Sequence, residues 1–361
     1  MRVLLLSKYP RMGASSRLRS LQFLTALADE GIEVTSSSLF DEKYLTELYT
    51  KGHRSKVRSL FLYLKRLFIL LTVFRYEVLW IEYEVFPYLP AFAERLLKLL
   101  GKPYVVDYDD AVFHNYDCSG SPLVRALLGK KIDAVMRNAA CVVAGNKYLA
   151  ARARRAGSYR IELVPTVVDS ERYQVGRRVQ SKNPVIGWIG SPSTQRYVVD
   201  IRVALKNVCD QTGARLLLVG ATESVREQLP GVPVDVVRWT EDSEADLVSQ
   251  MDVGIMPLED GPWEKGKCGY KLIQYMACGV PVVASPVGVN FEIVNENHCG
   301  QLAESLSEWT GDLLRILNSR PLQSEFGMAG RKAVEQKYSL QVQAPVLAGI
   351  LRSVAQRRGN A

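Results

Sequence analysis

Short apolar runs alternate with longer amphipathic stretches along the whole chain. Strands of a parallel sheet covered on both faces are continuous Val/Ile/Leu runs, whereas helices repeat apolar residues every third or fourth position. The pattern predicts twelve strands: Val3–Ser7, Ile32–Ser36, Val78–Glu82, Tyr104–Asp107, Cys141–Ala144, Ile161–Val164, Val185–Ile189, Arg215–Val219, Val234–Val237, Val253–Met256, Val280–Ala284 and Gly300–Leu302. It predicts helices over Leu18–Glu30, Leu89–Leu100, Leu123–Asn138, Ile201–Thr212 and Gly269–Cys278, among others.

The series of strands restarts after a polar stretch, Asp169–Asn183. We therefore expect two doubly wound, Rossmann-like α/β domains over residues 1–170 and 184–338, joined by a linker at 171–183. Ligands of such sheets bind outside the carboxyl ends of the strands. With two domains facing each other, the cleft between them is the predicted ligand site.

Composition narrows the class of protein. The chain has 361 residues, of which 47% are hydrophobic and 23% charged, which is typical of a soluble globular protein and excludes a disordered, collagenous or polytopic membrane protein. Six scattered cysteines form no C-x-x-C pair and three histidines lie far apart, so we expect neither a metal site nor disulfides, and a cytoplasmic location. The apolar run after Met1 is too short for a signal peptide and predicts a first strand.

Charge is unevenly distributed. Residues 1–180 hold 28 Lys and Arg against 18 Asp and Glu, which gives +10, and the rest of the chain carries −2. This asymmetry predicts an anionic partner for the first half, and no nucleic-acid motif accompanies it. Residues 55–75 combine five cations with many apolar residues. They predict either a core helix of the first domain or an interfacial helix on an anionic membrane surface.

Two loops after predicted strands are candidate anion sites. The first contains Gly13, and the second contains Gly190, Ser191 and Arg196. Glycine allows close approach of the backbone to a ligand, and free amides at a helix start attract anions. An ordinary capped helix start explains either loop equally well.

A third loop, Met256–Gly269, carries the clearest physical signal. Lys267 precedes the helix that follows this loop, Cys268 and Gly269 lead into it, and Lys271 lies in its first turn. Cations are disfavoured at a helix N-terminus because the helix dipole is already positive there. An anion held between the two lysines and the helix amides, such as a diphosphate, accounts for their placement.

The segment from Lys271 to Ser285, KLIQYMACGVPVVAS, resembles the signature of retaining glycosyltransferase family 4, glycosyl transferases group 1. The first glycine loop, the Val164–Asp169 segment, the Gly190–Arg196 loop and Val287–Val294 fit the same family, so the resemblance covers nearly the whole chain. It implies a GT-B fold, a nucleotide diphosphate sugar as donor, no metal or other cofactor, and a last helix in residues 339–361 that crosses back to the first domain.

The chain departs from this family at its pair of glutamates. Those positions hold Gly266 and Gln274, so the resemblance leaves Gln274 to bond the ribose and Glu264 or Asp260 to contact the donor sugar. The family's histidine position after the fourth strand falls on Asp109, which has acidic neighbours. We expect Asp107, Asp109 and Asp110 to meet the donor sugar, orient the acceptor hydroxyl or accept its proton; a loop of solvated aspartates is the alternative.

These observations predict a glycosyltransferase that moves a sugar, with retention, to a hydroxyl of a lipid-linked or envelope glycan acceptor. Its expected location is the cytoplasm, with possible attachment to the inner face of the membrane through residues 55–75. The competing hypothesis is a catalytically silent nucleotide-sugar-binding protein or the partner subunit of another transferase.

Overall fold

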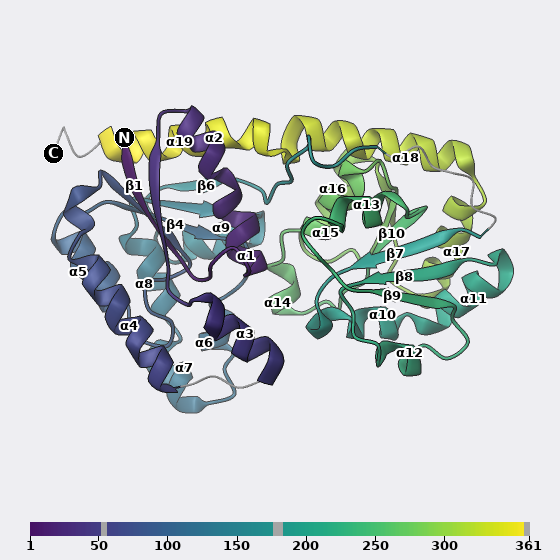
Figure 1. The fold of residues 1–361 in the computed structure, drawn as a ribbon, viewed down its shortest axis with the longest axis horizontal. Coiled ribbons are helices and arrows are strands. Elements are labelled where there is room, and N and C mark those ends of the chain that lie inside the picture. The colour runs from purple at the N-terminus through teal and green to yellow at the C-terminus, as the bar shows by residue number, and fades with distance from the viewer. Residues whose placement is uncertain (52–55, 176–182, 357–361) are drawn as a thin grey trace. The chain divides into compact units, whose positions relative to one another are not determined.

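The computed structural model describes residues 1–51, 56–175 and 183–356, and it divides the chain into two compact α/β units (Figure 1). Unit 1 consists of Met1–Thr166 and Leu340–Ala361, and unit 2 consists of Val167–Ser339. Most of the linker expected at 171–183 lies outside the described residues, but Tyr173 within that range is buried in the core of unit 2.

Unit 1 is built on a six-stranded parallel sheet with the strand order β2-β1-β3-β4-β5-β6. Its strands are β1 (Arg2–Ser7), β2 (Glu33–Ser38), β3 (Val78–Glu82), β4 (Tyr104–Tyr108), β5 (Cys141–Ala144) and β6 (Ile161–Leu163). Its helices are α1 (Ala14–Arg19), α2 (Leu24–Asp29), α3 (Glu42–Lys51), α4 (Lys56–Leu70), α5 (Phe92–Leu99), α6 (His114–Asp117), α7 (Pro122–Leu128), α8 (Lys131–Asn138), α9 (Lys147–Arg155) and the last helix α19 (Leu340–Gln356). Helix α19 packs against α2, β3 and β4, so the end of the chain belongs to unit 1.

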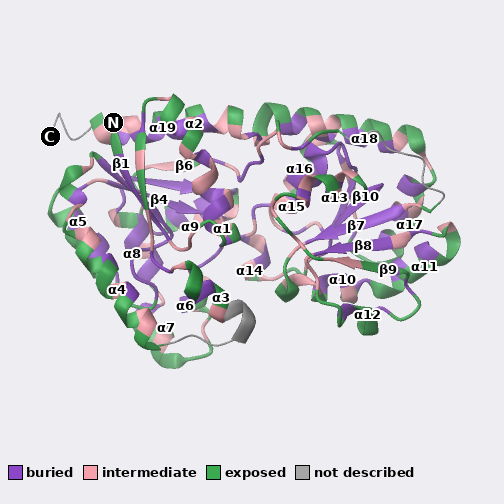
Figure 2. Cartoon of the chain, viewed as in Figure 1, coloured by how far each residue is buried: buried purple, intermediate pink, exposed green. Residues whose placement is uncertain are grey.

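Unit 2 contains a second six-stranded parallel sheet, with the order β12-β11-β10-β7-β8-β9. Its strands are β7 (Val185–Ile189), β8 (Arg215–Val219), β9 (Val234–Val237), β10 (Val253–Met256), β11 (Val282–Ala284) and β12 (Gly300–Leu302). Its helices are α10 (Arg196–Asp200), α11 (Arg202–Thr212), α12 (Val225–Gln228), α13 (Glu244–Ser249), α14 (Pro262–Lys265), α15 (Tyr270–Ala277), α16 (Val289–Asn297), α17 (Leu306–Leu317) and α18 (Arg320–Ala333). The strands of both units are largely buried. The exposed residues of the two units lie mainly on helices and loops (Figure 2).

All twelve predicted strands are present, with ends that differ by at most two residues. Two predicted helices are wrong as single helices. The helix expected over Leu18–Glu30 is interrupted by a 3-10 turn at Leu21–Phe23, and the one expected over Leu123–Asn138 is divided into α7 and α8 at Gly129 and Lys130. Glycine is about 1 kcal/mol poorer than alanine as a helix former, which favours an end there.

Each sheet has one point at which the chain reverses its direction of travel across the strands. In unit 1 the chain passes from β1 to β2 on one side and then to β3 on the other side of β1. In unit 2 it passes from β7 through β8 and β9 and returns to place β10 on the other side of β7. The loops that leave neighbouring strands at such a point diverge, and ligands of open α/β sheets bind there.

Candidate functional site

In unit 2 the loops after β7 and β10 hold most of the predicted donor residues. Gly190 and Ser191 follow β7 directly, and Lys267, Cys268 and Gly269 close the long loop between β10 and α15. Gly269 caps α15 with a left-handed φ of 67°, which glycine adopts without strain, and a side chain there would meet Ile293 at 2.5 Å. Tertiary packing therefore fixes how α15 begins.

Lys271 is the functional side chain that this arrangement positions. Its Nζ atom lies 4.6 Å from the centre of the Trp188 ring and 3.5 Å from Thr194 Oγ1. Burial, followed by the charge of Lys267, lowers the pKa of Lys271 to about 7. Within the described part of the chain, no carboxylate lies within 4 Å of its ammonium group. An anionic ligand would stabilise the charged form of Lys271 in this position.

Gly190 is the residue that makes room for this lysine. A Cβ atom at position 190 would approach Lys271 Nζ to 2.9 Å and the Trp188 ring to 2.4 Å. Glycine is therefore required by the close approach of two side chains rather than by an ordinary turn. The Ser191 hydroxyl is exposed and lies 2.9 Å from the hydroxyl of Ser193.

Arg196 occupies a different position from the two lysines. Its guanidinium is 60% exposed and lies 3.5 Å from the Glu259 carboxylate and 3.8 Å from that of Glu264. Glu264 is buried and accepts a hydrogen bond from the hydroxyl of Tyr197. The structure thus brings Arg196 and Glu264 together, and separately Lys267 and Lys271.

Gln274 is buried on the inner side of α15. Its Nε2 donates to the hydroxyl of Tyr173 at 3.0 Å, and that hydroxyl donates to Glu244. The indole of Trp239 donates to the same carboxylate at 2.6 Å. The amide nitrogen expected to serve a ribose is thus committed to an internal network. Sequence reasoning missed Glu244, because nothing in its neighbourhood distinguishes it from a surface glutamate.

In unit 1 the loops after β1 and β3 are joined by Glu82, the last residue of β3. Its carboxylate accepts hydrogen bonds from the backbone amide of Lys8, at 3.1 Å, and from the Ser16 hydroxyl, at 2.9 Å. The loop so held contains Gly13, where a Cβ atom would lie 2.4 Å from that of Tyr9. Burial raises the pKa of Glu82 to about 7; the Ser16 hydrogen bond opposes this rise and the charge of Asp109 adds to it.

The three predicted aspartates at β4 have separate environments. Asp107 is buried and accepts hydrogen bonds from Arg19 Nε at 2.7 Å and Trp80 Nε1 at 3.2 Å. Burial raises its pKa, and the Arg19 guanidinium opposes this rise. Asp109 and Asp110 lie beyond the strand and are half-buried. Asp107 is thus held inside unit 1 by Arg19 and Trp80, which indicates a structural role, and the expectation that it meets substrate stays a prediction.

Asp109 is held by the residue that follows Glu82. Tyr83 is buried, has a left-handed φ of 60° and donates its hydroxyl to Asp109. Such a backbone is uncommon for a tyrosine and costs about 1–3 kcal/mol, so the surrounding structure must compensate for it. Sequence reasoning missed Glu82 and Tyr83; the available signal was a lone glutamate ending a fully apolar strand.

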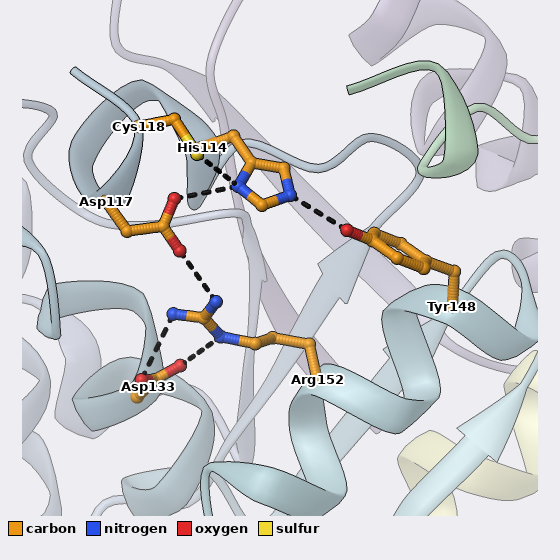
Figure 3. Close-up of polar contacts among 6 residues, drawn as sticks. All are labelled: His114, Asp117, Cys118, Asp133, Tyr148 and Arg152. Carbon is orange, nitrogen blue, oxygen red and sulfur yellow. Dashed lines mark hydrogen bonds and ion pairs between the residues drawn. The ribbon is translucent and has the colours of Figure 1, made fainter. Parts of the chain in front are cut away.

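A second polar cluster lies on α6 and its neighbours (Figure 3). His114 Nδ1 is 2.7 Å from Asp117 and 3.2 Å from the Cys118 sulfur, while its Nε2 is 2.9 Å from the Tyr148 hydroxyl. Arg152 joins Asp117 to Asp133, at 2.7 and 2.5 Å. The side chains of His114, Asp117 and Cys118 are close enough to share a metal ion. The guanidinium already neutralises Asp117, however, and burial, followed by the hydrogen bond to Asp117, raises the pKa of Cys118. These contacts connect α6, which follows Asp110, to α8 and α9, and they indicate a structural role.

The described residues also form two surface hollows. One, of about 540 Å³, is bordered by α18 and the end of α15 in unit 2, and the other, of about 440 Å³, by α7, α8 and α9 in unit 1. Neither is lined by a predicted site residue. Among the described residues, no helix has the length and apolar character needed to span a bilayer.

Comparisons with known proteins agree with this architecture. Residues 183–319 match the sequence model of the family glycosyl transferases group 1. No curated protein matches the chain. Among solved structures, sucrose-phosphate synthase from Thermosynechococcus elongatus is 16% identical, with a TM-score of 0.71 over 98% of this chain and 99% of that one. HepE from Anabaena, solved with UDP and glucose, is 17% identical, with a TM-score of 0.70 over 98% and 100% of the two chains.

A third similar structure is WaaG, described as a glycosyltransferase involved in lipopolysaccharide biosynthesis. It is 12% identical, with a TM-score of 0.67 over 97% of this chain and 99% of that one. At these identities the structures establish the fold, which is GT-B as the sequence predicted, and the family match shows what residues 183–319 of unit 2 are similar to. The chain has the GT-B fold of these solved structures, and its residues 183–319 match the family glycosyl transferases group 1.

Proposed function

We propose that the protein transfers a sugar from a nucleotide diphosphate sugar, held by unit 2, to a hydroxyl group of an acceptor, held by unit 1. The observation that carries this proposal is Lys271, a half-buried lysine with a pKa lowered to about 7 beside Lys267 and at the first turn of α15. HepE was solved with UDP-glucose, so a uridine diphosphate sugar is the first donor to test.

In this reaction the bond between the sugar's anomeric carbon and the diphosphate oxygen breaks, and a bond to the acceptor oxygen forms. Negative charge develops on the departing diphosphate. Lys271, Lys267 and the amides at the start of α15 stabilise that charge before and during bond cleavage, so the mechanism that we propose needs no metal. Groups already fixed in place stabilise a transition state without further reorganisation.

Asp109 is the candidate group at the reacting centre. It lies half-buried beyond the carboxyl end of β4, and its orientation is fixed by the hydroxyl of Tyr83. A carboxylate there orients the acceptor hydroxyl and accepts its proton, and the anomeric configuration of the sugar is retained. Asp110, the next residue, lies beside the proposed position of the acceptor hydroxyl. Arg196, the first residue of α10, and Glu264 of α14 follow β7 and β10 and contact the donor from a second side.

The proposed acceptor is lipid-linked or an envelope glycan. This part of the proposal rests on the basic character of the first half of the chain, +10 over residues 1–180, and on the apolar and basic segment 55–75. The enzyme would then work at the cytoplasmic face of a membrane.

Calorimetry with UDP and other nucleoside diphosphates tests the donor site. Each charge-assisted hydrogen bond is worth about 1.5–3 kcal/mol, so Lys271→Ala is expected to weaken diphosphate binding roughly ten- to a hundred-fold. The matched control is Lys206→Ala, which removes an exposed lysine of unit 2 that pairs with Asp210 and is expected to leave the affinity unchanged.

Equal affinity of wild type and Lys271→Ala would contradict the proposed donor site. Hydrolysis of the donor, or its transfer to an acceptor, separates an enzyme from the competing function of a silent nucleotide-sugar-binding protein. That alternative is favoured by one observation, namely that Gln274, at one of the family's glutamate positions, is committed to Tyr173. Tight donor binding without any turnover would establish it.

A further inference from the structure

Exposed large apolar side chains are concentrated in one part of unit 1. Of the 25 in the described residues, 14 lie between positions 57 and 100. Soluble proteins scatter single apolar residues over their surface, and a contiguous group marks an interaction site. The group belongs to α4, α5 and the segments next to them.

Helix α4 presents its apolar stripe to solvent. The stripe recurs at every third or fourth residue, and all its members are exposed: Val57, Leu60, Phe61, Leu64, Leu67 and Phe68, with Leu71 just beyond the helix. Phe61 and Phe68 are 65% and 68% exposed. The opposite side of the helix buries Leu62 and the charged Arg66. An amphipathic helix normally turns its apolar side to the core, and α4 does the reverse.

Helix α5 continues the same surface. Phe92, Leu96 and Leu99 lie on one side of it at spacings of four and three residues, and Leu99 is 83% exposed. The two helices are joined by a row of rings, in which Phe86 lies 5.6 Å from Tyr63 of α4 and 5.7 Å from Phe92 of α5. Figure 1 shows α4 and α5 along the outer edge of unit 1. We call the exposed stripes of α4 and α5 the α4–α5 face.

Cations border this face. Between positions 56 and 100 the exposed charged residues are Lys56, Lys65, Arg75, Arg95, Lys98 and a single carboxylate, Glu77, which accepts a hydrogen bond from the Arg2 amide. The other two cations of segment 55–75 serve the fold instead. Arg58 pairs with Asp41 at 2.5 Å, and Arg66 donates to the carbonyl groups of Ser7 and Ser37.

We propose that the α4–α5 face docks in the plane of an anionic lipid bilayer, with its Leu and Phe side chains at the boundary of the acyl chains and its exposed cations on the headgroups. An apolar stripe bordered by Lys and Arg has the composition of an interfacial helix. A core helix, the alternative that the sequence left open, is excluded because the apolar stripe is exposed. The inference rests on the membrane location in the proposed function and names the surface that binds; vesicle binding by this face and nucleotide binding by unit 2 can fail independently.

Co-sedimentation of the full chain with vesicles tests the proposal, using phosphatidylcholine alone or mixed with phosphatidylglycerol, at low and high salt. Wild type is expected to bind the mixed vesicles at low salt and to bind neutral vesicles more weakly. Val57→Ser/Leu60→Ser is expected to reduce binding at least tenfold, because both substitutions remove apolar surface that the bilayer would bury. Lys56→Ser/Lys65→Ser is expected to reduce only the salt-sensitive part.

The matched control is Val203→Ser/Leu306→Ser, which removes the same two side chains from exposed positions of unit 2 and is expected to bind like wild type. Nucleotide binding by unit 2 shows that each variant is folded and is independent of vesicle binding. Failure of wild type to sediment with mixed vesicles at low salt would overturn the proposal. A dimer that Val57→Ser/Leu60→Ser dissociates, without vesicle binding, would assign the face to a second copy instead.

Discussion

The reversal points of the two sheets carry opposite charges. In unit 2 the side chains gathered beyond β7 and β10 include Lys267 and Lys271, and burial lowers the pKa of the latter to about 7. In unit 1 the equivalent position beyond β1 and β3 holds Glu82, with Asp109 nearby, and burial raises the pKa of Glu82 to about 7. Burying a charge is unfavourable, so burial favours the uncharged form of both groups. It therefore lowers the pKa of the lysine and raises the pKa of the glutamate.

This difference supports the proposed division of ligands between the two units. A buried cation is stabilised when an anion arrives, so unit 2 suits the diphosphate. A carboxylate is stabilised by hydroxyl donors, so unit 1 suits the hydroxyl groups of a sugar or an acceptor. Under this proposal the same topology serves two kinds of ligand, and the side chains that follow the strands decide which kind binds.

The largest effect that would test this comparison is on turnover. Asp109→Asn retains the shape of the side chain and its bond from Tyr83 but removes the charge. We expect turnover to fall about 10²–10⁴-fold, the range for a general base, while donor affinity and melting temperature change little. Steady-state kinetics with separate donor binding measurements check this. Near-normal turnover would transfer the role to Asp110 or to no residue of this loop.

Asp107→Asn is expected to act on stability instead. It removes the carboxylate that Arg19 contacts at 2.7 Å in a buried pair. Loss of one member of such a pair leaves an uncompensated buried charge and costs about 3–5 kcal/mol of unfolding free energy. Urea unfolding measures the change, and Asp109→Asn, two residues away, is the matched control. Equal stability of the two variants would show that Asp107 is not a structural residue.

The fold was largely predictable because the central strands of both sheets are almost fully buried. A strand covered on both faces must be apolar throughout, and this leaves a clear mark such as Val-Leu-Trp-Ile at the start of β3. Helix ends were less predictable. The break between α7 and α8 depends on local backbone geometry at Gly129 and Lys130, which hydrophobic periodicity does not report.

The site was predictable where a residue contradicted its local surroundings. Lys271 was found because a cation at a helix start is unfavourable without an anion. Tyr83 and Glu244 were not, because their roles depend on partners that are distant in sequence, such as Asp109 and Tyr173. The same limit explains Asp107, which looked equivalent to Asp109 until the contact with Arg19 set it apart.

The smallest effect concerns the pH dependence of diphosphate binding. With a pKa of about 7, Lys271 is mostly neutral above that pH in the free protein, and a bound diphosphate favours its charged form. Binding therefore takes up a proton, so the affinity is expected to fall as pH rises above about 7, by at most tenfold per pH unit. Arginine stays charged over this range, so Lys271→Arg is expected to flatten the profile. Calorimetry in buffers of different ionisation enthalpy counts the proton directly. Equal slopes for wild type and Lys271→Arg would mean that Lys271 is already charged in the free protein, and the contrast between the two reversal points would then rest on Glu82 alone.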